Sequence, residues 1–233
     1  MRLLNMQSRQ LHTRYDDAIP PYAILSHTWD QQEAEVSFED MKRPHHVHMP
    51  RYDKIENTCR LAEIGGLEWY GSTRAAICFA HLADVQRSDP ISDLDVAFEH
   101  CRWFTRGWTL QKLLAPGQLV FYDRTWEAVG DRASLAGQIQ RRTAAPPSLP
   151  IGERMSWASD RNTTRKEDLA YCLFGIFDVH MPLLYGEGDH AFRRLQEEIL
   201  KTWETTSRGL PTPTNSVSWG RHMLSLAGWH LRG

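Results

Sequence analysis

The chain has 233 residues and a formal net charge of −2, with 41% hydrophobic and 24% charged residues. This composition is typical of a globular protein rather than a disordered one, and the length suits one good-sized domain, alone or with an appendage. A charge so close to zero gives no electrostatic preference for nucleic acid or for an anionic membrane.

Targeting signals and cysteines indicate the compartment. No apolar run approaches the roughly 20 residues that a membrane-spanning helix needs, and the N-terminus lacks the apolar core of a secretory signal. The four cysteines are scattered and form no Cys-x-x-Cys pair: Cys59, Cys78, Cys101 and Cys172. We interpret them as buried, reduced thiols, and we expect a soluble cytoplasmic protein that binds neither membranes nor nucleic acid.

Strands and helices are predicted to alternate in the first half of the chain. Three short apolar runs predict strands at Tyr22–Ser26, Ala75–Leu82 and Gln118–Tyr122. Two segments predict helices, at Arg51–Ile64, which stops at a Gly-Gly pair, and at Thr109–Leu114, which stops before a proline. This alternation favours an α/β domain with a largely parallel sheet.

The pattern becomes helical from about residue 134 onward. Thr164 and Glu167 have the spacing of a capping box, which predicts a helix from there to Gly175. Gly188 is expected to precede a last helix, because the apolar residues after it follow a helical period. We expect these helices to bury Trp157, Leu169, Leu173, Phe174 and Phe192.

These elements predict one domain and a tail. Residues 1–133 are expected to form the α/β core, and residues 134–205 a helical extension of the same domain. Residues 206–233 lose the periodicity and gain Pro, Ser and Thr, which predicts a poorly ordered tail.

A string of histidines, His-His-Val-His, occupies positions 45–48. A metal site needs three or four ligands with defined geometry, and no cysteine or acid follows the string at zinc-like spacing. We therefore interpret the string as a solvated loop and predict no metal site.

Three strings mix aromatic and charged residues densely. They are YAILSHTW at Tyr22–Trp29, RWFTRGWTLQKLLAP at Arg102–Pro116, and RMSWASDRNTTRKEDLAYCLFGIFDVHMPLLYGEGDHAFRRLQEEI at Arg154–Ile199. With RLLN at Arg2–Asn5, they resemble, in the same order, the fungal heterokaryon-incompatibility (HET) domain, which triggers growth arrest or cell death when genetically different fungal cells fuse. The resemblance implies a nonself-recognition and cell-death signalling module that works through protein partners or self-association. We expect no cofactor.

The HET core is distantly similar to Toll/interleukin-1 receptor (TIR) domains, some of which cleave NAD. This similarity implies a TIR- or flavodoxin-like sheet, and it gives an alternative function as an enzyme that hydrolyses NAD or a related nucleotide. Such hydrolases have the motif Trp-Cys-x-x-Glu, and aligning Trp108 with its tryptophan places Lys112 at the catalytic glutamate. A cation does not accept a proton or stabilise an oxocarbenium-like centre as a carboxylate does, so we expect no catalysis.

One block of the HET pattern is absent from this chain. HET domains carry a block resembling Trp-Ile-Asp-Thr-x-Cys-Ile, whereas here Gly65–Tyr70 runs almost directly into the strand predicted at Ala75–Leu82. An Asp-bearing strand and the helix after it are therefore expected to be missing near residue 70, which truncates the parallel sheet because crossovers need a dozen or more residues. Both a natural degenerate allele and a mis-spliced product fit this pattern.

The first group of candidate pocket residues is Ser26, His27 and Trp29, which follow the first predicted strand. Ligands of open α/β sheets bind beyond the carboxyl ends of strands, which places this group at a suitable edge. Neighbouring residues on a strand point to opposite faces, so Ser26 and His27 are not expected to form a nucleophile and base. In the alternative interpretation, Ser26 and His27 bind loop backbone groups and Trp29 packs.

The second group is Arg106, Trp108, Gln111 and Lys112. Trp108 and Lys112 are four residues apart and share a helix face, with Gln111 beside them. Arg106 has the chemistry to contact phosphate, although surface arginines more often pair with nearby acids. The alternative interpretation places Trp108 in the core and leaves Lys112 solvated.

Overall fold

The structure is a computed structural model that describes residues 2–15, 19–29, 35–37, 39–43, 46–49, 51–70, 76–87, 91–143, 155 and 157–207. The chain divides into two compact units. The first unit comprises Met1–Trp103 and Ala115–Gln138, and the second comprises Phe104–Leu114 and the residues from Ile139 onward.

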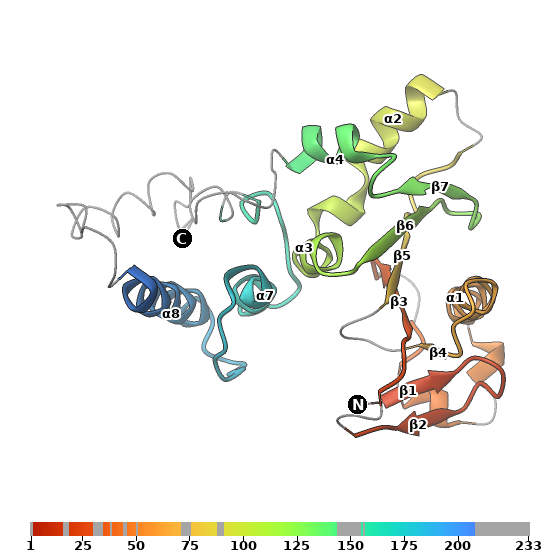
Figure 1. The fold of residues 1–233 in the computed structure, drawn as a ribbon, viewed down its shortest axis with the longest axis horizontal. Coiled ribbons are helices and arrows are strands. Elements are labelled where there is room, and N and C mark those ends of the chain that lie inside the picture. The colour runs from red at the N-terminus through yellow and green to blue at the C-terminus, as the bar shows by residue number, and fades with distance from the viewer. Residues whose placement is uncertain are drawn as a thin grey trace. The chain divides into compact units, whose positions relative to one another are not determined.

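Within the described residues, the first unit contains a seven-stranded sheet in the order β2-β1-β4-β3-β5-β6-β7 (Figure 1). The strands are β1 (Arg2–Asn5), β2 (Leu11–Thr13), β3 (Ala23–His27), β4 (Trp69–Tyr70), β5 (Ile77–His81), β6 (Gln118–Tyr122) and β7 (Ala128–Asp131). The α/β class and the three predicted strands, found as β3, β5 and β6, are confirmed.

The sheet is mixed, which corrects the prediction of a largely parallel one. The pairs β4–β3, β3–β5 and β5–β6 are parallel, whereas β1–β2, β1–β4 and β6–β7 are antiparallel. The turns that join β1 to β2 and β6 to β7 are too short for a crossover, so each adds an antiparallel edge strand.

Helices and side chains cover both faces of this sheet. Helix α1 (Tyr52–Ile64) contacts β3 and β4, and Cys59 and Ala62 belong to the same apolar cluster as Phe79 of β5 (Figure 1). On the opposite face Trp103 meets Phe121 of β6 edge to face, with ring centroids 5.4 Å apart. Helix α2 (Ile91–His100), which the apolar pattern did not predict, leads toward this tryptophan.

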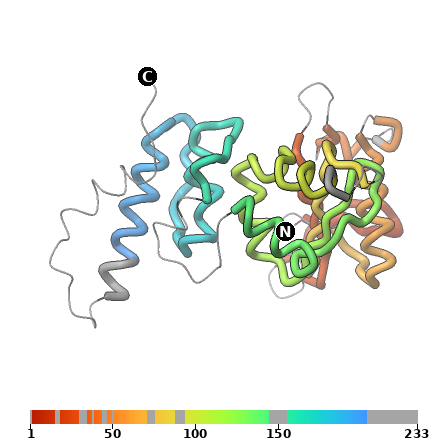
Figure 2. The backbone as a smooth tube through the Cα atoms, turned by 90° about the horizontal axis from the view of Figure 1, so that it is seen from above, coloured from red at the N-terminus to blue at the C-terminus, as the bar shows by residue number. Residues whose placement is uncertain are grey.

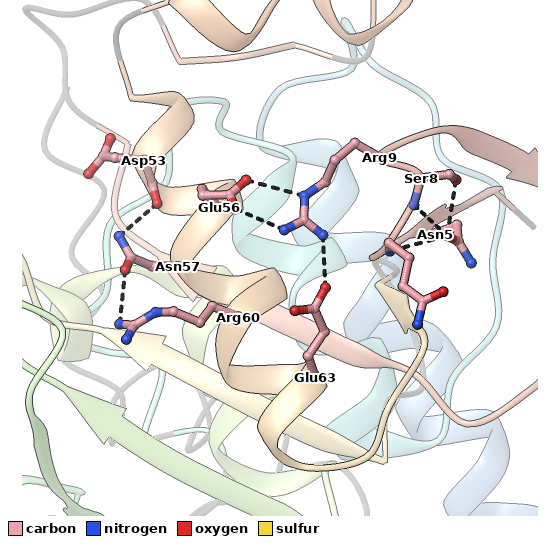
Figure 3. A network of polar contacts seen from close by, with 9 residues as sticks. Asn5, Ser8, Arg9, Asp53, Glu56, Asn57, Arg60 and Glu63 are labelled. Carbon is pink, nitrogen blue, oxygen red and sulfur yellow. Dashed lines mark hydrogen bonds and ion pairs between the residues drawn. The ribbon is translucent and has the colours of Figure 1, made fainter.

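A polar network fixes the β1–β2 hairpin to α1 (Figure 3). The Arg9 guanidinium donates to both carboxylate oxygens of Glu56, at 3.2 and 2.8 Å, and to Glu63 at 3.1 Å. The turn itself is closed by Asn5, whose side-chain oxygen accepts the backbone N–H of Ser8 at 2.8 Å. This network therefore fixes the position of the hairpin relative to α1.

The second unit is helical in its described part, with α3 (Gly107–Leu114), α6 (Asp168–Tyr171), α7 (Phe174–Phe177) and α8 (His190–Ser207). Helix α4 (Ala136–Thr143) begins at the end of the first unit and continues into the second. Figure 2 shows α8 as the long blue segment. The first two residues of the predicted tail, 206 and 207, belong to α8, and residues 208–233 lie outside the described residues.

The predicted capping box is wrong, and with it the single helix from Thr164 to Gly175. The Glu167 side chain does not cap the helix that follows it, and two short helices replace the long one. Its Oε1 instead accepts the backbone N–H groups of Gly186 and Gly188, at 2.8 and 2.9 Å. This long-range contact gives hydrogen-bond partners to two backbone N–H groups of a turn. A Glu167 side chain that capped its own helix would leave those two groups without this partner.

The core of the second unit gathers around residues of α3, α6 and α8, including Leu110 and Leu195. Trp157 and Leu173 are buried as predicted, whereas Leu169, Phe174 and Phe192 are only partly buried, which corrects the prediction for these three. Phe174 and Phe192 pack against the edge of the core cluster.

Candidate functional site

A cavity of about 370 Å³ opens on the α1 face of the sheet in the first unit. Its walls come from β1, β2, β3, β4, α1 and the segment at residues 35–37, so strands and helix enclose it together. Leu4, Leu25 and Ile55 contribute apolar residues to the lining, and Arg2 and Arg51 are basic residues of the same lining.

A buried carboxylate that contacts a lysine and a histidine forms part of the wall. Glu35 forms an ion pair through Oε1 with the ammonium of Lys54, and its Oε2 lies 3.3 Å from Nε2 of His27. The side chains of Glu35 and Lys54 are 8% and 4% exposed. Burial alone would raise the pKa of Glu35, but the contacts with His27 and Lys54 outweigh burial and hold that pKa at about 2. The group is therefore a carboxylate at neutral pH.

Local sequence rules explain how these groups meet. His27 is the last residue of β3, so it lies at the carboxyl end of a parallel strand and, by alternation, on the same face as Leu25. Lys54 belongs to the first turn of α1. Arg51 caps that helix with a left-handed backbone, at φ 67°, which ends the preceding loop beside the cavity.

The first group of sequence candidates divides across the sheet. His27 and Trp29 line the cavity, and Trp29 is 66% exposed. The Ser26 hydroxyl faces the other side, where it accepts a hydrogen bond from Nε1 of Trp103 at 3.0 Å. Ser26 is therefore turned away from His27, as two neighbouring strand residues must be, and it holds the tryptophan of the opposite face.

The second group lies in the second unit, on and just before α3. Trp108 is 40% exposed and Lys112 is half-buried. The amide of Gln111 donates to the carbonyl of Tyr171 at 3.5 Å, and Arg106 donates to the hydroxyl of Thr164 at 3.0 Å. Placing Trp108 in the core is wrong, because α3 turns Leu110 inward and leaves the Trp108–Lys112 face outward.

The start of α3 depends on a residue that the sequence did not single out. Arg161 is buried, and its guanidinium donates to the carbonyls of Trp157 and Arg106 at 2.9 and 2.8 Å and to the hydroxyl of Thr109 at 3.0 Å. Burial lowers the pKa of Arg161 to about 10, which still leaves it charged at neutral pH. No sequence signal distinguishes it from the neighbouring arginines.

Sequence reasoning also missed four residues of the first unit: Arg51, Lys54, Glu35 and His81. His81 pairs with His27 across β3 and β5 and stacks on Trp126, with ring centroids 4.4 Å apart. Burial lowers the pKa of His81 to about 4, so the ring is neutral at pH 7. The rule that selected His27, a polar residue at the carboxyl end of a parallel strand, selects His81 equally.

The described residues contain no group of three His, Cys, Asp or Glu side chains placed to hold a metal ion. His48 is exposed, whereas His45 and the side chain of His46 lie outside the described residues. All four cysteines are buried and none forms a disulfide. In the described part of the chain, no helix has both the length and the apolar character to cross a membrane.

Comparison with known proteins identifies one informative similarity. The chain is 41% identical over 223 residues to the vegetative incompatibility protein HET-E-1 of Podospora anserina. The match covers 78% of this chain but 16% of that protein, so the chain spans a small part of its relative's length. No protein-family model matches the chain, and no solved structure matches it.

Proposed function

We propose that this chain is a HET-type module for fungal nonself recognition and cell-death signalling in the cytoplasm, and that it acts by binding partners or itself rather than by catalysis. The observation that carries the proposal is the 41% identity, over 78% of the chain, to a vegetative incompatibility protein. Because the chain matches 16% of that protein, the role of the whole relative is extended to this chain only as part of the proposal.

The proposal includes a TIR- or flavodoxin-like core from which one block is missing. The parallel run β4-β3-β5-β6 supports this core. The missing strand is expected near β4. Strand β4 has two residues and pairs with β3 through one residue pair, Tyr70 and Ala23. The alignment is 223 positions long, but it includes only 78% of this chain, which is about 182 residues. About 40 positions of the alignment are therefore gaps in this chain.

Two observations support a role without catalysis. Lys112 supplies a cation on the exposed face of α3, where the TIR resemblance requires a carboxylate. In the first unit, the carboxylate of Glu35 is paired with the ammonium of Lys54, and a pKa of about 2 makes it a weak proton acceptor at neutral pH.

Expression in a fungal host tests the proposal. One strain carries the chain as it is, and a second carries it with a Trp-Ile-Asp-Thr-x-Cys-Ile block and its helix grafted after Trp69. We expect growth arrest from the grafted chain and weak or no arrest from the unmodified chain, scored as colony growth at equal protein levels. A grafted chain with Leu173→Ala, which disrupts the core, is the matched control. A folded grafted chain that leaves growth unaffected would count against a HET-type function.

The alternative function, hydrolysis of NAD or a related nucleotide, draws on the outward Trp108–Lys112 face of α3. Reversing the charge at a catalytic position removes several kcal/mol of stabilisation, on the order of a thousandfold in rate. We expect no measurable NAD loss with the purified chain, and little with Lys112→Glu alone. Turnover by the unmodified chain that a Trp108→Ala substitution abolishes would favour the enzyme over the binding module.

A further inference from the structure

We propose that the loop at 182–188 of the second unit is a surface for self-association, and that its partner is the same loop of a second copy of this chain. Self-association is already part of the proposed function, on which this surface therefore rests. The loop exposes adjacent apolar side chains, buried groups hold its backbone, and the charges beside it are complementary to themselves.

Apolar side chains follow one another on the outside of this loop. Leu183, Leu184 and Tyr185 are 54%, 51% and 48% exposed, and Pro182 before them is exposed as well. Consecutive exposed apolar residues are unfavourable in water, and where they occur in an ordered structure they mark a surface that binds another molecule. The 182–188 loop therefore has the character of a protein interface.

Partly or fully buried side chains fix the first half of the loop. Tyr171 is 1% exposed, and its hydroxyl accepts the N–H of Leu184 at 2.8 Å and donates to the carboxylate of Glu187 at 3.0 Å. Arg194 pairs with Glu187 and donates to the carbonyl of Pro182 at 2.8 Å. The loop therefore loses little conformational freedom when its outer side chains are covered, which lowers the cost of binding.

The second half of the loop is fixed by Glu167. This residue is 7% exposed, and its Oε1 accepts the N–H groups of Gly186 and Gly188. Both glycines have left-handed backbones, at φ 103° and 56°, which a residue with a side chain adopts only with strain. A buried carboxylate thus holds a turn whose outer surface is apolar, which a loop that only connects two helices does not require.

Tyr185 is held in place before any partner arrives. Its hydroxyl donates to Asp168 at 3.0 Å, and the guanidinium of Arg165 lies 4.5 Å from the centre of its ring. The ring also meets that of Tyr171 edge to face, with centroids 5.5 Å apart. A fixed and half-exposed tyrosine is suited to the centre of an interface, where large aromatic side chains contribute most of the binding energy.

The charges beside the loop favour a second copy as the partner. Lys166 and Asp189 precede Glu167 and follow Gly188, and they form an ion pair at 3.8 Å with side chains 74% and 65% exposed. Two such pairs placed antiparallel across a twofold axis bring each ammonium opposite the carboxylate of the other copy. A partner surface of one dominant charge would instead face one favourable and one unfavourable charge here.

Sedimentation velocity of the purified chain tests the surface. We expect the average mass to rise with protein concentration toward that of a dimer. Leu183→Glu places a charge at the contact and is expected to weaken dimerisation roughly tenfold or more. Leu200→Glu is the matched control and should leave the dimer unchanged, because this position is 46% exposed but lies about 15 Å along α8 from the end nearest the loop.

Two outcomes would overturn the proposal. A chain that is monomeric at every concentration would leave the loop to a different protein. A dimer that Leu200→Glu weakens as much as Leu183→Glu does would place the contact elsewhere, provided that circular dichroism shows both variants folded.

Charge reversal tests whether the partner is a second copy. Lys166→Glu and Asp189→Lys each place like charges opposite one another in a twofold dimer, so each variant alone should dimerise less than the unmodified chain. A mixture of the two variants restores opposite charges at both contacts, and native mass spectrometry should detect dimers that contain one copy of each. A mixture that dimerises no better than its components would refute the twofold pairing.

The dimer assay and the growth assay fail separately. Growth arrest by the grafted chain together with a monomeric unmodified chain would refute only the self-association surface. A dimer that Leu183→Glu dissociates, together with no growth arrest from the folded grafted chain, would refute only the HET-type function.

Discussion

In the first unit the buried carboxylate of Glu35 faces the side chains of Lys54 and His27, whereas in the second the buried guanidinium of Arg161 faces backbone carbonyls and a hydroxyl. Glu167 follows the pattern of the second unit, with backbone N–H groups of Gly186 and Gly188 as its partners. Opposite charge thus balances Glu35, whereas backbone dipoles balance Arg161 and Glu167.

The two kinds of partner have different consequences for the structure. Glu35 and Lys54 line a cavity and satisfy one another through their side chains. A charged side chain that binds backbone groups fixes the path of the chain, because its partners move only when the backbone moves. The second arrangement suits a rigid helical frame around Leu110 and Leu173.

The largest expected effect comes from breaking the ion pair of the first unit. Glu35→Ala leaves the Lys54 ammonium, 4% exposed, without its counter-charge, and removing one partner of a buried pair costs about 3–5 kcal/mol of the free energy of unfolding. Urea unfolding followed by circular dichroism measures this loss. Glu39→Ala, which breaks the exposed Glu39–Lys42 pair, is the control and should cost less than about 0.5 kcal/mol.

The double variant Glu35→Ala with Lys54→Met sharpens the same test. An apolar side chain in place of the ammonium removes the uncompensated charge, so the pair of substitutions should recover most of the lost stability. Losses that simply add would mean that the two charges do not depend on one another.

A pH effect of up to about 3 kcal/mol is expected from His81. Its pKa is lowered to about 4 in the folded protein from an ordinary value near 6.5. Between these two values the unfolded chain binds a proton that the folded chain does not, so the free energy of unfolding should fall as pH falls from about 6.5 to 4. Below that window, Glu35 adds a further loss between its ordinary value and about 2.

The substitution His81→Phe isolates this contribution. Phenylalanine keeps a ring against Trp126 but does not titrate, so the slope of stability between pH 6.5 and 4 should become shallower. His180→Asn, at an exposed position of the second unit, is the control and should leave the slope unchanged. An unaltered slope in His81→Phe would show that another group governs the acid sensitivity of the first unit.

The helix entry in the second unit is expected to be less sensitive. A Cβ at Gly107 would lie 2.6 Å from Cγ2 of Thr163 and 3.0 Å from Sγ of Cys172. Gly107→Ala forces α3 away from these groups, and such overpacking costs about 1–3 kcal/mol in urea unfolding. Thr163→Ser removes the closer methyl group, so it should relieve part of the loss in the double variant. A neutral Gly107→Ala would contradict the close approach.

The sequence predicted the parts of the fold that depend on local pattern. The apolar runs at β3, β5 and β6 and the spacing in α1 and α8 carry period-2 or helical signals of sufficient length. Strands of two to four residues, such as β4 and β7, carry too few positions for any period to be read. The capping-box spacing at Thr164 and Glu167 misled because a distant turn offered Glu167 better partners than its own helix did.

Some residues of the candidate site could likewise be predicted from sequence, and others could not. His27 and Trp29 were found because strand ends follow a topological rule. Glu35, Lys54 and Arg51 were missed because their meeting depends on how α1 and the segment at 35–37 pack beside β3, which no local spacing encodes. From sequence alone, an isolated charged residue is predicted to be exposed to solvent. Only the tertiary packing shows which of these residues are buried.

The smallest expected effect compares two arginines of the second unit. Arg161→Lys keeps the charge but replaces a fork of donors by one ammonium, which cannot reach the carbonyls of Trp157 and Arg106 and the hydroxyl of Thr109 together. The loss of part of this set should cost about 1 kcal/mol, seen as a lower urea midpoint at constant slope. Arg165→Lys, at an exposed position where the guanidinium stacks on Tyr185 at 4.5 Å, should cost less than about 0.5 kcal/mol. Equal losses at the two positions would mean that backbone-satisfied charge stabilises the second unit no more than a surface contact does, and the contrast between the units would fail.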